Sequence, residues 1–520
     1  MTKIDKNELN EKIAKLSPEK RRLLELRLKE KGTSLPVDDQ ISPRLSNEAS
    51  PLSFSQRRLW FLHQLHPDMI AFNLPMALRF SGKLDRNLLS KSINAILSRH
   101  EVLRTTYIEK NGVPLQFVHP PLEVELEQFD LTRLREEEKE SEAERLILNE
   151  IQQPFDLSRD IMFKSFLYRI GPQDHIFFLL RHHIASDGWS ARIVQRELLE
   201  GYLALQERRS PDLPQLQVQY ADYAIWQWER LHQQGFAREL DYWRDQLKGL
   251  PQLELPIDQP RPSIISYNGS QIPIKITPSL TQKLISLSQQ QRVTMNTTLL
   301  AAYSVLLYRY TGQDDFAIGV PVSGRTRRVL EPLIGFFINT LVLRTDLSGN
   351  PTFLDLLHQI NQTSIEALDH QHLPFEILVE DLQPDRQLNR SPLAQATFQY
   401  QDIPIQPTTN IPGLSIEHIP IDPGTSQNDL SLTITKSAEG LEGFARFNTD
   451  LFEAATIARF IDYYKNLLTD VVDHPDRQIC QLMLLTHKDK EKIKAPQILV
   501  RPTIEFEEFN LKEVNGTVVQ

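Results

Sequence analysis

Residues 175–190 have the sequence HIFFLLRHHIASDGWS. Ile176–Leu180 is an unbroken apolar run, too short for a typical helix and the right length for a strand buried on both faces. The adjacent pair His182-His183 follows, so both imidazoles are expected where the strand leaves the core, at the edge of a cleft. In the pair Asp187-Gly188 that comes next, the carboxylate can fix the loop or bind a distant cation, and the glycine predicts a turn that other residues resist.

The composition excludes several classes of protein. The 520 residues are 40% hydrophobic and 24% charged, which predicts about three domains, or one large two-lobed unit with appendages. A net charge of −10 leaves no broad basic field for nucleic acid. The longest uncharged stretch, around Val293 to Tyr308, is too short to span a membrane. Cys480 is the only cysteine and the charged start lacks a signal-peptide core, so a cytoplasmic location is expected.

Turn-forming and polar residues divide the chain into predicted segments. Residues 1–32 are a charged helical leader and a candidate docking element, and 33–51, rich in Ser, Asn, Asp and Pro, are a linker. Two lobes are expected, at 52–248 and 266–486. Residues 249–265 between them contain four prolines, a composition that suits an extended crossing. Residues 487–520 are a mixed-charge tail.

Helical and strand periodicities alternate in both lobes. Asp85 is expected to cap a helix, Asn111-Gly112 to turn a hairpin, and Asp130 to open a strongly acidic helix. Strands are predicted at 105–109, 115–118, 163–170, 175–180, 315–322, 336–344, 394–400, 430–436 and 441–447. Helices are predicted at 191–206, 279–291, 296–310, 354–368 and 452–473. The run 441–460 is laid out like 175–193, which predicts a repeated architecture.

The motifs of several other enzyme classes do not occur in the sequence. There is no Gly-x-Ser-x-Gly elbow, no Walker-type phosphate loop, no Gly-x-Gly-x-x-Gly and no His-Glu-x-x-His. Two spaced histidine pairs, His63/His66 and His370/His372, are more typical of surface or loop histidines than of metal ligands. We therefore expect no metal site.

The order His-His-x-x-x-Asp-Gly after a buried strand resembles the signature of the condensation domains of nonribosomal peptide synthetases. Further stretches resemble other motifs of that family: Ser53–Trp60, Arg99–Thr106, Tyr220–Trp226, Leu255–Pro262, Ile334–Thr340, His370–Glu376 and Arg390–Leu393. The chain departs from the family pattern at Ser55, where alanine is common, at His372, where aspartate is usual, and at Ser391, which replaces asparagine. The resemblance covers roughly residues 50 to 486.

This resemblance implies an α/β fold: a V-shaped pseudo-dimer of two chloramphenicol-acetyltransferase-like lobes with a tunnel between them. Donor and acceptor peptidyl carrier proteins would enter the tunnel from opposite faces, each presenting its substrate as a phosphopantetheine thioester. The chain itself would bind no cofactor. Nothing in it resembles an adenylation core or a carrier motif, so adenylation domains would act in trans or lie in segments missing from this sequence.

The resemblance also implies roles for individual residues. The catalytic set is His182, His183, Asp187 and Gly188, with His183 at the reacting centre and His182 packed behind the loop. Asp187 would form a structural ion pair with Arg325 from the other lobe. Five residues, Arg104, Tyr223, Trp226, Asn339 and Ser391, are candidates for the tunnel lining. For Arg104, Tyr223, Trp226 and Asn339, core packing or a hydrogen bond inside one lobe is the alternative.

The expected activity is amide formation between a carrier-bound acyl or peptidyl donor and a carrier-bound amino acid. One alternative is an ester-forming or chain-releasing enzyme of the same fold. Another is a catalytically idle module that recruits partners to a carrier. The sequence leaves open whether His183 is a general base or only orients the amine, and it does not identify the donor, the acceptor or the final secondary metabolite.

Overall fold

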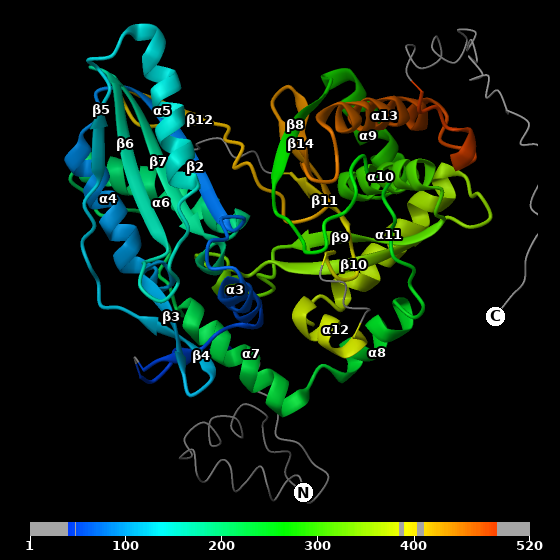
Figure 1. Ribbon diagram of the computed structural model, residues 1–520, viewed down its shortest axis with the longest axis horizontal. Coiled ribbons are helices and arrows are strands. Elements are labelled where there is room, and N and C mark those ends of the chain that lie inside the picture. The colour runs from blue at the N-terminus through cyan, green and yellow to red at the C-terminus, as the bar shows by residue number, and fades with distance from the viewer. Residues whose placement is uncertain (1–39, 47, 384–388, 403–409, 486–520) are drawn as a thin grey trace, which may run out of the picture.

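The computed structural model of the protein describes residues 40–46, 48–383, 389–402 and 410–485. In this part of the chain, buried hydrophobic side chains form two separate cores, one for each of two lobes. Figure 1 shows the lobes side by side as a V, and α3 (Phe54–Leu65) contacts α12 (Phe375–Leu382) near its base. The predicted leader at 1–32 and tail at 487–520 lie outside the described residues.

The first lobe is built on a five-stranded sheet with the order β12-β2-β7-β6-β5. These strands span Leu414–Ile419, Asn73–Gly82, Asp174–His182, Phe163–Gly171 and Glu127–Asp130. A second sheet, β1-β4-β3, comprises Ser50–Pro51, Val113–Val118 and Thr105–Lys110. The helices of the first lobe are α3, α4 (Arg86–Arg99), α5 (Glu136–Ile151) and α6 (Gly188–Gln206). The predicted hairpin and the Asp85 cap are confirmed, since β3 pairs with β4 and the Asp85 carboxylate accepts from Asn87 N and Leu88 N.

The second lobe has a six-stranded sheet with the order β10-β9-β11-β13-β14-β8. These strands span Asn339–Asp346, Asp315–Val322, Ala396–Gln401, Leu430–Ser437, Gly440–Asn448 and Gly269–Ile276. Its long helices are α9 (Pro278–Gln291), α10 (Met295–Thr311), α11 (Phe353–Asp369) and α13 (Ala454–Asp473). Because β14 leads through a short loop into α13 as β7 leads into α6, the predicted repeat of strand, loop and helix is present.

The acidic helix begins at Glu136, not at Asp130 as predicted. Asp130 ends β5, and its carboxylate accepts hydrogen bonds from the backbone N–H and the hydroxyl of Thr132. Such a local turn satisfies the carboxylate without starting a helix. The strand predicted at 336–344 also starts later, at Asn339, because the backbone before it is hydrogen-bonded to the first lobe, as described below.

The boundary between the lobes differs from the prediction. Figure 1 shows α7 (Tyr220–Gln234) running beneath both lobes and α8 (Ala237–Gln246) following it on the side of the second lobe. Trp243, Leu253 and Leu255 are all buried in the second core. Residues 249–265, expected to cross between the lobes, therefore pack against the second lobe, and α7 makes the crossing. The described end of the predicted linker 33–51 belongs to the first lobe, since Ile41 is buried in its core.

Two segments of the second half return to the first lobe. β12 pairs antiparallel with β2 and so supplies the edge of the first sheet. Residues 323–338 form the loop that follows β9, called here the crossing loop, and its Leu333, Ile334 and Phe337 side chains are buried in the first core. The candidate site lies where this loop meets β7. No helix in the described part of the chain has both the length and the apolar character needed to cross a membrane.

Candidate active site between the two lobes

β7 carries the histidine pair to the seam between the lobes. The strand lies between β2 and β6 in the first sheet, and its residues 175–182 are all buried, which confirms the strand predicted from the apolar run. His182 is its last residue. His183 opens a 3-10 turn, His183–Ala185, that leads into α6.

His182 is enclosed within the first lobe. Only 3% of the residue is exposed, and its ring lies edge-on to Phe155 with centroids 5.7 Å apart. Its Nδ1 accepts a hydrogen bond of 3.1 Å from Ile184 N. Burial lowers the pKa of His182 to about 3, so the ring is neutral and can act as this acceptor. These contacts give His182 a structural part in holding the turn.

His183 occupies a different environment, because part of the residue remains exposed. Its ring lies 4.5 Å from that of Phe336, on the crossing loop, and 6.4 Å from that of Phe72 in the first lobe. The Nδ1 atom is enclosed by protein and makes no hydrogen bond to the described residues. Burial lowers the pKa of His183, although Asp187 opposes this effect. The seam thus holds a neutral, partly accessible imidazole.

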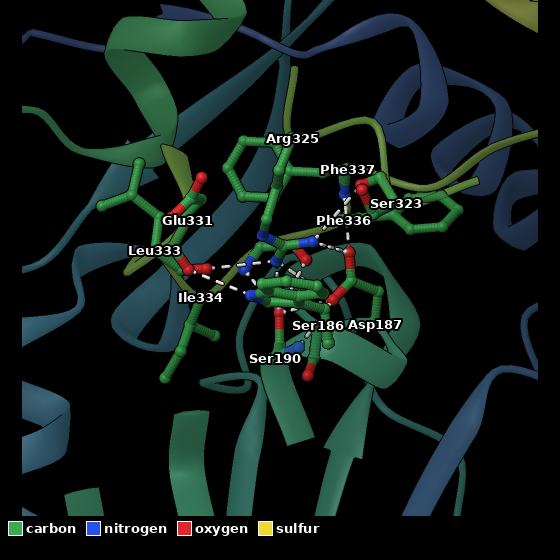
Figure 2. A network of polar contacts seen from close by, with 12 residues as sticks. Ser186, Asp187, Ser190, Ser323, Arg325, Glu331, Leu333, Ile334, Phe336 and Phe337 are labelled. Atoms are coloured by element: carbon green, nitrogen blue, oxygen red, sulfur yellow. Dashed lines mark hydrogen bonds and ion pairs between the residues drawn. The ribbon is translucent and has the colours of Figure 1, made fainter. Parts of the chain in front are cut away.

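A buried ion pair joins the His-His loop to the crossing loop. Arg325 donates from Nη1 to Oδ2 of Asp187 at 2.8 Å and from Nη2 to Oδ1 at 3.1 Å (Figure 2). The two side chains are 1% and 0% exposed. Burial would raise the pKa of Asp187, but the charge and hydrogen bonds of Arg325 and those of Ser190 hold it below the usual range. The pair is therefore ionised and connects residues from the two halves of the sequence.

Ser190 belongs to the same polar network, and sequence reasoning did not single it out. Its hydroxyl lies 2.7 Å from Asp187 Oδ1 and accepts from Arg325 Nη2 and Gly335 N, both at 3.0 Å. Figure 2 shows Asp187, Ser190 and Arg325 converging on this point. The available signal was its spacing, because a residue three positions after an Asp often lies in the first turn of a helix that the Asp caps. Asp187 does cap α6 through Ser190 N.

The crossing loop is anchored by residues from several of the sequence motifs. Ile334 N lies 3.5 Å from His100 Nδ1, and Phe337 N donates to Asp187 Oδ2 at 3.1 Å. Tyr220, at the start of α7, donates from its hydroxyl to Phe336 O at 2.6 Å. The sequence motifs around His100, Asp187 and Tyr220 therefore meet on one backbone segment of the other half.

Gln56 connects the first sequence motif to the His-His loop. This residue is 0% exposed, and its Nε2 donates to Ile184 O at 3.1 Å. The same nitrogen lies 3.1 Å from the hydroxyl of Tyr107, and Oε1 accepts from Ser53 N. Because Ile184 directly follows His183, these bonds fix the backbone that carries the imidazole.

The turn requirement predicted for Gly188 is wrong. Its φ is not positive, it is the first residue of α6, and a Cβ there would meet no atom within 4 Å. The position is a helix start that any residue can adopt. The backbone requires glycine instead at Gly324, where φ is +64° and a Cβ would lie 1.8 Å from Phe337 O.

Gly324→Ala is expected to lower the melting temperature, whereas Gly188→Ala is expected to leave it unchanged. An alanine at 324 must adopt a left-handed conformation, which costs roughly 1–2 kcal/mol, and must also displace the Phe337 carbonyl. Thermal unfolding of the two variants measures the difference. Gly349→Ala is a matched control, since its φ is +76° but its Cβ would meet no atom, and it separates strain from collision. Equal melting temperatures for the 188 and 324 variants would contradict this assignment.

Two of the candidate tunnel residues have contacts inside a single lobe. The Arg104 guanidinium donates to the backbone carbonyls of Leu97, at 3.1 Å, and of His119. The Asn339 amide donates to Leu373 O at 2.7 Å and accepts from Phe375 N at 2.9 Å. For these two residues the hydrogen bond inside one lobe that was the alternative is present, and a lining role stays a prediction.

The other three candidates lie in different places. Tyr223 and Trp226 are on α7, where the Tyr223 ring lies 4.8 Å from Phe337 and the Arg327 guanidinium lies 5.1 Å from the Trp226 ring. Ser391 is in the second lobe, where its carbonyl accepts from Gln395 Nε2. A position on the path of a substrate stays a prediction for these three.

A pocket of about 590 Å³ opens between segments of the two halves of the sequence. It is lined by residues 65–71 and Gln152 of the first lobe, by Ile265, Tyr267 and Asn268, and by residues 423–425. Phe72 continues the first of these segments. Its ring lies 6.1 Å from that of Tyr267 and 6.4 Å from that of His183. The Phe72 ring thus lies near both a residue that lines the pocket and the imidazole of His183.

The sequence of the chain is similar to a known protein family and to individual proteins of known name. The model of the family described as "Condensation domain" matches residues 46–494. One of the subunits of linear gramicidin synthase from Brevibacillus parabrevis is 43% identical over 453 residues, which are 86% of this chain and 9% of that protein. The chain thus spans less than a tenth of the length of that relative.

Solved structures match over most of the chain. The X-domain from teicoplanin biosynthesis has a TM-score of 0.77 and 27% identity, and the match covers 86% of this chain and all of that one. A four-domain nonribosomal peptide synthetase bound to AMP and glycine also has a TM-score of 0.77, at 23% identity, over 86% of this chain and 35% of that one. The second likeness shows the fold alone.

Proposed function

The chain belongs to the condensation-domain family, and from this premise we propose that it forms an amide bond between a carrier-bound acyl or peptidyl thioester and a carrier-bound amino acid. The observation that supports the proposal most directly is the His183 imidazole. It is neutral, it keeps part of its surface exposed, and it is held at the seam of the lobes. We assign the catalytic set to His182, His183, Asp187 and Gly188, with direct chemistry at His183 alone.

In the proposed reaction the acceptor amine attacks the thioester carbonyl. The C–N bond forms, the C–S bond breaks, and the proton lost by nitrogen reaches the departing thiolate through His183. Amide formation from a thioester is thermodynamically favourable, so the main task of the enzyme is to orient the acceptor amine and the donor thioester. Such orientation is worth on the order of 10⁵ M or more in effective concentration. An α-amino group has an ordinary pKa near ~8, so a fraction is already deprotonated at neutral pH.

The proposed substrates are presented by partner proteins in the cytoplasm. Donor and acceptor carriers would bring phosphopantetheine thioesters to the seam, and adenylation domains would load the carriers in trans or from segments outside this sequence. A relative of which this chain spans only 9% supports a setting of several cooperating domains.

An assay with two separately loaded carriers tests the function. We expect the acyl group to move onto the acceptor carrier only when both carriers are loaded, and intact-protein mass spectrometry reads both carriers. A parallel arm offers the same amino acid as a free amine and a matching alcohol. Product with a free acceptor would favour the ester-forming or chain-releasing alternative. Absence of product from carriers that a known condensation enzyme accepts would favour the idle recruitment module.

A further inference from the structure

A buried imidazole and a buried carboxylate meet where α4 ends against α6. His100 follows the last residue of α4, and its Nε2 lies 2.8 Å from Oε2 of Glu197 on α6. The two side chains are 1% and 0% exposed. The other oxygen of Glu197 accepts from Nε of Arg99 at 3.2 Å. The proposed reaction assigns no part to this pair.

The surroundings of His100 fix its protonation state and its tautomer. Burial lowers the pKa of His100, against the opposing effect of Glu197, so the ring is neutral and carries one N–H. Burial would raise the pKa of Glu197, but the hydrogen bonds of His100 and Arg99 hold it below the usual range. An ionised carboxylate can only accept hydrogen bonds. The ring proton must then lie on Nε2, which leaves a free lone pair on Nδ1.

That lone pair faces the crossing loop. Ile334 N donates to Nδ1 of His100, with 3.5 Å between the two atoms. The next amide, Gly335 N, donates to Ser190 Oγ at 3.0 Å. Two side chains of the first lobe therefore hold consecutive amides of the loop. Glu197, behind the imidazole, determines that His100 can act as one of these two acceptors.

Phe336 connects this backbone to the proposed reacting centre. It lies two residues after Ile334, and its ring stands edge-on to that of His183 with centroids 4.5 Å apart. Phe72 is farther from the imidazole, at 6.4 Å. Nδ1 of His183 makes no hydrogen bond to the described residues, so packing against Phe336 helps to orient this ring. A displacement of the loop at Ile334 would therefore reach the imidazole.

We infer that His100 is a positioning residue for the proposed reaction. Its tautomer is set by Glu197, and in this form it holds the crossing loop at Ile334. The loop in turn keeps the Phe336 ring against His183. This inference rests on the proposed function, because the orientation of that imidazole affects the rate only if it assists the attack of the amine. A misplacement of about 1 Å can cost about 10²-fold in rate.

Two substitutions separate the roles of the two ring nitrogens. Asn is short and places its oxygen near the position of Nδ1, so His100→Asn keeps an acceptor for Ile334 N and loses the bond to Glu197. Gln reaches the position of Nε2, so His100→Gln keeps a partner for Glu197 and leaves Ile334 N without one. In the two-carrier assay, His100→Gln is expected to lower kcat by about 10²-fold at an unchanged KM for both carriers. In His100→Asn, most of that loss is expected to be restored.

NMR of ring-labelled histidine in the full chain gives a readout that needs no substrate. The wild-type His100 signals are expected to show a proton on Nε2 and none on Nδ1. The His183 signal, assigned with His183→Gln, is expected to move in His100→Gln toward its position in Phe336→Leu, because both variants lose the ring current of Phe336. In His100→Asn it is expected to stay near the wild-type position. Circular dichroism confirms that each variant is folded.

Equal effects of His100→Asn and His100→Gln on kcat and on the His183 signal would overturn the inference, because the position of the acceptor would then not matter. A proton on Nδ1 of His100 in the wild type would also overturn it. If His100→Gln does not fold, a folded His100→Asn whose His183 signal is displaced as in Phe336→Leu has the same consequence. Since the NMR measurement needs no carrier, its failure and failure of the two-carrier assay are distinguishable.

Discussion

Asp187→Ala is expected to lower the free energy of unfolding by about 3–5 kcal/mol, because it leaves a guanidinium buried without its counter-charge. Arg325 is 1% exposed, and both of its terminal nitrogens donate to Asp187. The substitution also removes the acceptor for Phe337 N and the cap of α6. Denaturant unfolding followed by circular dichroism measures the loss, which we expect to be accompanied by loss of activity.

Two further variants make this prediction sharp. The double variant Asp187→Ala with Arg325→Met removes both charges and is expected to recover most of the lost stability. Asp381→Ala is a matched control at a more exposed bidentate pair, with Arg244 at 2.8 and 2.5 Å, and its effect is expected to stay within about 1 kcal/mol. A double variant that is no more stable than Asp187→Ala would show that the unpaired charge is not the cause.

The pH dependence of the pair follows from the direction of its pKa shift. The pKa of Asp187 in the folded protein lies below its ordinary value of 3.8. The pair's contribution is therefore fully present above that ordinary value, and it is lost only as the pH falls through the lower, folded-state pKa. The stability difference between wild type and Asp187→Ala should accordingly be constant across the neutral range.

The sequence predicted local features of the site well, because the physical causes are local. An apolar run of strand length, bounded by polar residues, was enough to place β7 and the turn that follows it. The polar residue ahead of a helix was informative at Asp85, which caps α4, but not at Asp130, which ends β5. Residues brought together by long-range topology were harder to predict. Ser190 and Gln56 form hydrogen bonds with residues that are distant in the sequence. No local sequence pattern predicts such bonds.

The wrong predictions have the same origin. Gly188 looked like a turn glycine because its backbone angles cannot be read from its neighbours, whereas Gly324, which does need a positive φ, lies in an ordinary-looking loop. Prolines suggested a crossing at 249–265, but the apolar Leu253 and Leu255 among them are what anchors that segment to one lobe. The edge strand β12 belongs to the other lobe's sheet, which no local pattern indicates.

His183→Ala is expected to lower the rate of product formation in the two-carrier assay by about 10²–10⁴-fold, the usual contribution of a general base. Stability should change little, because Nδ1 makes no hydrogen bond to the described residues and part of the residue is exposed. His182→Ala is the control. It removes the acceptor of Ile184 N and a buried ring, so activity and melting temperature should fall together.

The pH–rate profiles separate the two roles that the sequence left open for His183. Its pKa is lowered by burial, so a base at this position is active at neutral pH and loses activity only as the pH falls through that lowered value. The wild-type rate should then fall in two steps on the acid side, one for the acceptor amine with a pKa near ~8 and one for His183. The His183→Ala profile should keep only the first step. Profiles of the same shape, differing by a small constant factor, would assign His183 to orienting the amine instead of taking its proton.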